Sequence, residues 1–240
     1  MDVRDFSYDG TIEGYLSVVS YCIENKTMPR KITAETFEWD DGLSVRIRSD
    51  YNAADRLYKL VGRRASAEVQ QMICDLFLTC VTDMEMDLFI MICKGIKYGA
   101  VIADDYSDEL MRRIQFSIRD LYREAASVLS SMNAVKIDNV TFAVINPRNR
   151  VLPIIYRNIL NNEDNDDVLI YDKRHKMALI RMGETDMILD TGRIAGSDLG
   201  SVNDLYGKMW PYFASDLNTL GRQVLKERAD SLSKLWYIAV

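Results

Sequence analysis

Residues 168–180 read VLIYDKRHKMALI, and this stretch decides the fold class. Two apolar runs, 168–171 and 177–180, flank the five polar residues DKRHK. Short apolar runs bounded by polar turn residues predict β-strands. Because the connection is too short for a crossover helix, the two strands are expected to pair antiparallel.

On both sides of this hairpin, the pattern predicts a small antiparallel sheet. Residues 140–145 and 187–189 are further predicted strands, and Asn146-Pro147 ends the first of them. Residues 151–160 are expected to form a short helix, with Pro153 in its first turn. Residues 161–167 are expected to form an acidic loop, and residues 201–229 to be helical.

The N-terminal half predicts helices instead, because apolar residues recur there every three to four positions. Asp50, Ser66 and Ser107 are the expected caps of three of these helices. The expected helical ranges are 11–25, 51–64, 66–81, 84–102 and 107–131.

Alternating apolar residues at 43–47 predict a strand, which should pair with a short strand near Phe6 as an N-terminal hairpin. Helices followed by strands are typical of an α+β fold. The sequence therefore predicts one α+β domain over residues 1–240. Residues 1–132 would be mainly helical, and residues 133–240 would hold the antiparallel sheet and closing C-terminal helices.

The composition of the chain indicates a cytoplasmic protein. No apolar run exceeds six residues, the length of residues 88–93, whereas a membrane span needs about 20. The first five residues lack the apolar core of a signal peptide. No two of the four cysteines have the spacing of a zinc ribbon or dithiol motif, so they are expected to be buried thiols in a reducing compartment.

Several chemistries lack their residues in this sequence. His175 is the single histidine, and it is expected to lie exposed in the basic 173–176 turn, where adjacent cations weaken it as a base. No glycine-rich phosphate loop and no cysteine cluster occurs, so no cofactor and no metal site is predicted. Asp50 and Asp172 are the carboxylates that would serve a catalytic role, if the chain has one.

Basic side chains gather in four places despite a net charge of −6, one of them being Arg148 and Arg150, which flank the Pro147 turn. Such cations can hold phosphates, while nearby tyrosines can stack on exposed bases. Ordinary solvated helix faces are the alternative, because acidic residues are interleaved with the basic ones. The candidate DNA contacts are Arg56 and Arg63 on one helix, Arg119 and Arg123 on another, and Arg174 and Lys176 in the turn.

Several segments stand in an order that is informative together: Tyr8-Asp9-Gly10-Thr11-Ile12-Glu13-Gly14, Asp50 with Ala54, Arg56 and Leu57, Asn146-Pro147 with Val151-Leu152-Pro153, residues 168–180, Met209-Trp210 with Tyr212-Phe213, and Trp236. In this order they resemble a family of uncharacterised DNA metabolism proteins. The family's Glu-x-His-Arg is here Glu124-Ala125-Ala126-Ser127, and its Pro-x-Arg-Tyr-Trp ending is Ser233-Lys234-Leu235-Trp236.

The resemblance implies a role in DNA repair or modification. Members accompany a radical-SAM protein, and a related domain is fused ahead of a uracil-DNA-glycosylase-like domain. The leading hypothesis is an accessory protein that binds single-stranded or damaged DNA, or docks the radical-SAM partner. The alternatives are a DNA hydrolase that uses carboxylates and a protein-interaction subunit without nucleic-acid contact.

Overall fold

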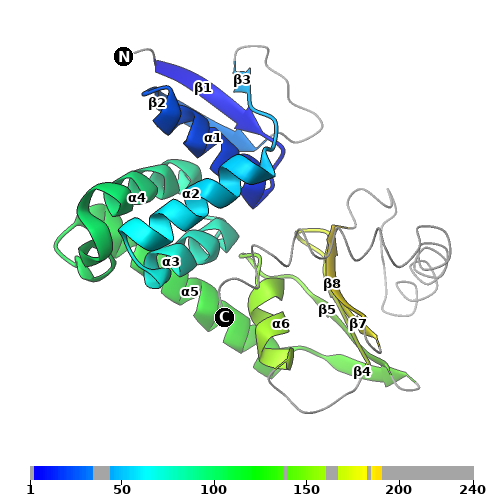
Figure 1. Cartoon of the computed structure of the whole chain (residues 1–240). Coiled ribbons are helices and arrows are strands. Elements are labelled where there is room, and N and C mark those ends of the chain that lie inside the picture. The colour runs from blue at the N-terminus through cyan, green and yellow to red at the C-terminus, as the bar shows by residue number, and fades with distance from the viewer. Residues whose placement is uncertain (1–2, 35–43, 138–139, 161–166, 183–184, 191–240) are drawn as a thin grey trace. The chain divides into compact units, whose positions relative to one another are not determined.

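The computed structural model describes residues 3–34, 44–137, 140–160, 167–182 and 185–190 (Figure 1). The chain divides into two compact units, Met1–Arg119 and Asp120–Val240. Helices dominate the first unit and a sheet dominates the second, so the α+β prediction is confirmed. Residues 161–166, 201–229 and the C-terminal tryptophan segments, for which the sequence makes predictions, lie outside the described residues.

A three-stranded parallel sheet opens the first unit. It consists of β1 (Val3–Tyr8), β2 (Met28–Ala34) and β3 (Val45–Arg46) in the order β2-β1-β3. The expected pairing near Phe6 is confirmed, because Phe6 lies opposite Val45. The predicted N-terminal hairpin is wrong, because β1 pairs in parallel with both neighbours. Between β1 and β2, α1 (Ile12–Glu24) returns the chain, and such a crossover yields parallel strands.

Strand β2 is not anticipated from the sequence, where Met28-Pro29 only ends the preceding helix. Proline lacks the N–H that a central strand must donate, but an edge strand tolerates it. Pro29 lies on the edge strand β2, opposite Arg4, beside a register shift between Arg4 and Asp5. The helix itself ends at Glu24, and Pro29 is the second residue of β2.

The helices of the first unit begin near their expected positions. They are α2 (Tyr51–Arg64), α3 (Ala67–Leu78), α4 (Met84–Tyr98), a 3-10 turn η1 (Gly99–Asp104) and α5 (Glu109–Ser131), which runs into the second unit. Asp50 and Ser66 are caps, as predicted. Ser107 is not, because Asp108 Oδ1 accepts from Met111 N at 3.1 Å. The helix expected over 84–102 ends at Tyr98, because Gly99 adopts φ +81°.

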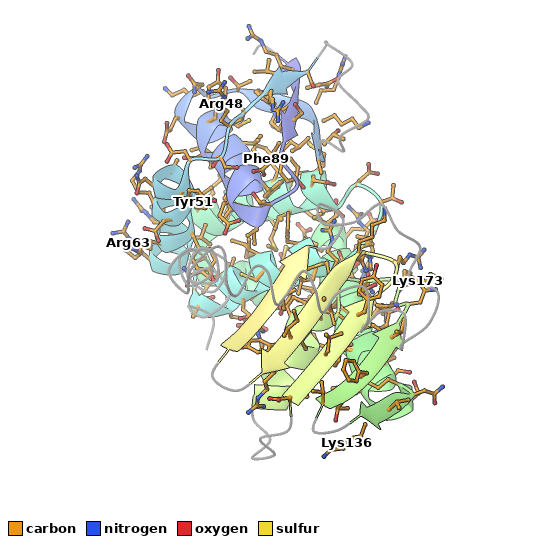
Figure 2. The ribbon with its side chains drawn as sticks, turned by 90° about the vertical axis from the view of Figure 1, so that its right-hand side faces the viewer. Arg48, Tyr51, Arg63, Phe89, Lys136 and Lys173 are labelled. Atoms are coloured by element: carbon orange, nitrogen blue, oxygen red, sulfur yellow. The ribbon has the colours of Figure 1, made fainter. Side chains whose placement is uncertain are left out.

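The core of the first unit forms around α1. Tyr8 and Tyr15 are buried with their rings edge to face at 5.6 Å. Tyr15 Oη donates to the carbonyl of Glu85 at 2.6 Å, so the buried hydroxyl has an acceptor. Phe89 belongs to the same interior (Figure 2). Cys22 and Cys74 are buried as expected, whereas Cys93 is half-buried and Cys80 is exposed.

The second unit contains a five-stranded sheet in the order β4-β5-β6-β7-β8. Its strands are β4 (Ala134–Ile137), β5 (Val140–Ile145), β6 (Asp167–Asp172), β7 (Met177–Met182) and β8 (Thr185–Asp190). The expected antiparallel pairing holds for β6–β7 and β7–β8. Strand β4 is not anticipated from the sequence, and it pairs antiparallel with β5. The expected antiparallel pairing is wrong for β5–β6, which pair in parallel because α6 (Leu152–Leu160) connects them and packs against β7 (Figure 1).

Among the described residues, no helix is long and apolar enough to cross a membrane.

Candidate nucleic-acid interface

The carboxyl ends of β5 and β6 bring together two segments that are far apart in the sequence. Ile145 lies opposite Asp172 in the parallel pairing, and Lys173 N donates to the carbonyl of Ile145 at 3.0 Å. The 146–150 loop and the 173–176 turn therefore begin side by side. Ligands of open α/β sheets bind outside the carboxyl ends of parallel strands. This edge of the sheet is therefore a candidate binding site.

Asp172 determines the shape of the 173–176 turn from a fully buried position. Its Oδ1 accepts from Arg174 N at 3.0 Å and His175 N at 3.1 Å. Its Oδ2 lies 2.7 Å from His175 Nδ1. Lys176 completes the turn with φ +52°, in the left-handed region. The carboxylate thus uses both oxygens to hold the backbone and the ring.

The expectation of an exposed His175 is wrong. Its side chain is 11% exposed and pairs with Asp172 beneath the turn. The three adjacent cations suggested a solvated tip, but the fold directs the histidine to the buried carboxylate. A carboxylate on Nδ1 fixes the orientation and tautomer of an imidazole, as in enzymes that use a histidine for proton transfer.

Glu124 on α5 fixes the other segment, the 146–150 loop. Its carboxylate accepts from Arg148 N at 2.6 Å, Asn149 N at 3.0 Å and Asn149 Nδ2 at 2.8 Å. Asn149 is 1% exposed, and Pro147 is also buried. A carboxylate with three such donors is a firm anchor for a loop. No local sequence signal identifies this role, because the partners lie 24 and 25 residues away.

The result is a surface that we call the basic edge, formed by Arg148, Arg150, Lys173, Arg174 and Lys176. Arg150 is half-buried and the other four are exposed. Within the described residues, Arg148, Lys173 and Arg174 form no ion pair through their side chains. The acids of the edge, Glu124 and Asp172, accept from backbone N–H groups instead. In Figure 2, Lys173 lies at one end of the sheet, and Lys136 of β4 lies at the other.

The remaining predicted cations have different surroundings. Arg123 pairs with Asp120 at 3.2 Å on the surface of α5. Arg119 lies over the ring of Phe116, with 4.3 Å from its guanidinium carbon to the ring centroid. Arg56 and Arg63 are exposed on α2, and Figure 2 shows Arg63 directed away from the helices.

The two candidate catalytic carboxylates both have structural partners. Asp50 caps α2 by accepting from Asn52 N at 2.9 Å and Ala53 N at 3.0 Å. Asp172 holds the turn described above. Within the described ranges, no cluster of three or more histidine, cysteine or acidic side chains could hold a metal ion.

Glu13, which the sequence marks only as part of the Tyr8–Gly14 segment, is a buried acid in the first turn of α1. It is 2% exposed, and its Oε1 finds no hydrogen-bond partner among the residues that the structure describes. Burial raises the pKa of this carboxyl, and the nearby Asp9 raises it further. Asp9 itself accepts from Thr11 Oγ1 at 2.6 Å and Ser49 Oγ at 2.6 Å. A side chain at Gly14 would meet this carboxylate, which explains the glycine.

The fold and the basic edge define an α+β protein whose second unit presents cations at the carboxyl ends of two parallel strands. A family model described as a domain of unknown function, DUF4130, matches residues 82–237, which is more than half of the chain, and the protein belongs to this family. The matched range includes the basic edge, whereas the Tyr8–Gly14 signature precedes it. No curated protein matches the chain.

Proposed function

We propose that this protein binds DNA through the basic edge, as an accessory protein of DNA repair or modification. The phosphates would be held by Arg174 and Lys176, as expected from the sequence, together with Arg148 and Lys173. The resemblance supplies the DNA context and the expected radical-SAM partner. Arg56, Arg63, Arg119 and Arg123 remain proposed phosphate contacts outside this edge.

The observation that carries the proposal is the separation of charges at the edge. Arg148, Lys173 and Arg174 extend into solvent without an ion pair among the described residues, while Glu124 and Asp172 face the backbone. Exposed arginines of this kind can form paired hydrogen bonds with phosphate oxygens. An acidic protein can bind DNA in this way, because a local field matters more at contact distance than the net charge.

Salt titration of binding tests the proposal directly. The double variant Arg148→Ala, Arg174→Ala removes two cations and keeps the backbone N–H groups that bind Glu124 and Asp172. We expect weaker binding to single-stranded DNA, and a slope of log K against log salt reduced by roughly 1.4, since each phosphate contact contributes about 0.7. Fluorescence anisotropy with a labelled oligonucleotide measures both quantities.

The single variant Arg174→Ala removes one cation of the basic edge and should lower the slope by about 0.7. Lys136→Ala is its matched control. It removes one exposed cation at the other end of the sheet, where Lys136 lies opposite Thr141. The control should keep the wild-type affinity and slope. Equal affinities and slopes for the wild type and the double variant, on both single-stranded and duplex DNA, would exclude the basic edge as the binding surface.

A second candidate function is supported by the Asp172–His175 pair. One alternative expected from the sequence is a DNA hydrolase that uses carboxylates, Asp50 and Asp172 among them. The burial of Asp172 favours a different division of roles, in which it orients His175 and the imidazole transfers the proton. The test is turnover of labelled single-stranded DNA by the wild type and by His175→Gln. Absence of cleavage by the wild type would exclude the DNA hydrolase.

Docking of a radical-SAM protein and a cytoplasmic location are the remaining parts of the proposal. Affinity capture with the tagged full chain, followed by mass spectrometry, tests the partner. Nuclease treatment during capture separates a protein contact from a bridge through DNA. Recovery of a partner together with no measurable DNA binding would favour the interaction subunit without nucleic-acid contact.

A further inference from the structure

Phe116 on α5 differs from the other phenylalanines in the described part of the chain. Its side chain is 50% exposed, whereas Phe6, Phe77, Phe89 and Phe142 are at most 5% exposed. A single exposed apolar residue is common and carries no function by itself. Phe116 is distinguished by the charged side chains that surround its ring.

Arg119 lies over the Phe116 ring, with 4.3 Å from the guanidinium carbon to the ring centroid. Such a stack holds the ring and the cation in one orientation. Arg112 is exposed four residues before Phe116, and therefore lies on the same side of the helix. The exposed ring thus lies between two cations.

Two acids near this helix face are engaged by other arginines. Asp120 pairs with Arg123 at 3.2 Å, and the buried Asp87 of α4 binds Arg113 at 2.9 Å and 2.5 Å. Glu109, at the start of α5, lies three residues before Arg112 and on the same side of the helix. Arg112 and Arg119 together still exceed this one carboxylate, so positive charge is in excess around the ring.

We propose that Phe116 and Arg119 form a stacking platform for an unpaired base, with Arg112 and Arg119 contacting the phosphates on either side of it. This inference rests on the proposed DNA binding and specifies its substrate as a strand with unpaired bases. The positive charge complements the phosphates, and the exposed ring complements the face of a base. A base within a duplex has both faces covered by its neighbours, so the platform discriminates against duplex DNA.

The experiment compares Phe116→Ala with Phe116→Trp in the full chain, on an oligothymidine strand and on a duplex of equal length. Stacking on an aromatic side chain contributes about 1–3 kcal/mol per base. We therefore expect Phe116→Ala to weaken single-strand binding about tenfold and to leave duplex binding unchanged. Phe116→Trp should keep the affinity for the single strand, because it keeps an aromatic face. Tyr106→Ala, which removes an aromatic that is 65% exposed in the same unit, should have no effect.

The outcomes separate this inference from the function on which it rests. Unchanged single-strand affinity of Phe116→Ala, alongside a loss in the Arg148→Ala, Arg174→Ala variant, would overturn the platform and leave the basic edge standing. Equal losses on single strand and duplex, or a Phe116→Trp variant as weak as Phe116→Ala, would overturn stacking. A wild-type chain that binds neither DNA would overturn both proposals.

Discussion

Glu13 in the first unit and Asp172 in the second are both buried carboxylates, yet their surroundings differ. Asp172 is 0% exposed, and its oxygens accept from two backbone N–H groups and face a histidine nitrogen. Glu13 is 2% exposed, and within the described part of the chain one of its oxygens has no hydrogen-bond partner. Burial of the carboxylate is therefore compensated by hydrogen bonds at Asp172 and only incompletely compensated at Glu13.

The difference separates a carboxylate that anchors the backbone from one that lacks donors for its charge. Removal of an anchoring carboxylate leaves its donors unsatisfied. A carboxylate without enough donors favours its protonated form, and its charge is a cost to the folded state. Asp172 should thus stabilise the second unit, and Glu13 should weaken the first unit at neutral pH.

The largest expected effect comes from Asp172→Ala. This substitution leaves the N–H groups of Arg174 and His175 and the imidazole without their acceptor at a buried position. Each unsatisfied buried group costs about 1–3 kcal/mol, so we expect a loss of about 3 kcal/mol in the free energy of unfolding. Urea unfolding followed by circular dichroism measures this loss, and hydrogen exchange of the β6 and β7 amides locates it.

Asp172→Asn separates the hydrogen bonds to the backbone from the attraction between the carboxylate and His175. Its amide oxygen can still accept from the two backbone N–H groups, while the attraction to His175 is weakened. We expect a loss smaller than that of Asp172→Ala by about 1 kcal/mol or more. Equal stability of Asp172→Ala and the wild type would show that the turn holds its shape without the carboxylate.

Glu124→Ala is expected to have the next largest effect, because a half-buried carboxylate with three donors resembles Asp172 more than Glu13. The variant leaves Arg148 N, Asn149 N and Asn149 Nδ2 without their acceptor. Since water can reach part of this site, we expect a loss of about 2 kcal/mol, measured by urea unfolding.

Asp120→Ala is the control for this prediction on the same helix. It removes a carboxylate whose pairing with Arg123 is exposed on both sides. Exposed ion pairs contribute about 0–1 kcal/mol, so the control should stay close to the wild type. A control as destabilised as Glu124→Ala would attribute the effect to the helix rather than to the anchored loop.

Much of the fold follows from periodicity, and the errors have a common cause. The predicted range 51–64 coincides with α2, and the strands at 140–145 and on both sides of the 173–176 turn are where they were expected. The sense of pairing was wrong for β1–β3 and β5–β6. Periodicity reports which face of an element is buried, but the sense of pairing depends on where the intervening helix returns the chain.

The candidate site could be predicted only in part, for a related reason. Arg174 and Lys176 lie in the turn that the sequence marked as basic, and Asp172 was singled out there. The exposure of His175 was misjudged because three adjacent cations indicated solvent, whereas the buried partner decides its position. The sequence points to Glu124 only as the start of the Glu124–Ser127 segment, and its anchoring role does not follow because its hydrogen-bond partners are distant in sequence. Nothing local indicates the burial of Glu13, which lies in the first turn of α1.

Glu13→Gln is expected to have the smallest effect, and its sign tests the contrast with Asp172. Burial raises the pKa of Glu13 in the folded state above its value in the unfolded chain. The folded state therefore binds the proton more tightly, so this group's contribution to stability is fully present below the unfolded pKa, about 4.3. That contribution is lost as the pH rises through the higher folded pKa.

Glutamine is nearly isosteric and does not titrate, so it removes this pH dependence. Relative to the wild type, we expect Glu13→Gln to gain stability between acidic and neutral pH, by about 1 kcal/mol or less. Thermal unfolding of both proteins across pH 4–8 measures the difference. A variant that instead becomes less stable than the wild type with rising pH would mean that the folded state favours the charged carboxylate. Glu13 would then be an anchor like Asp172, and the contrast between the two buried acids would be lost.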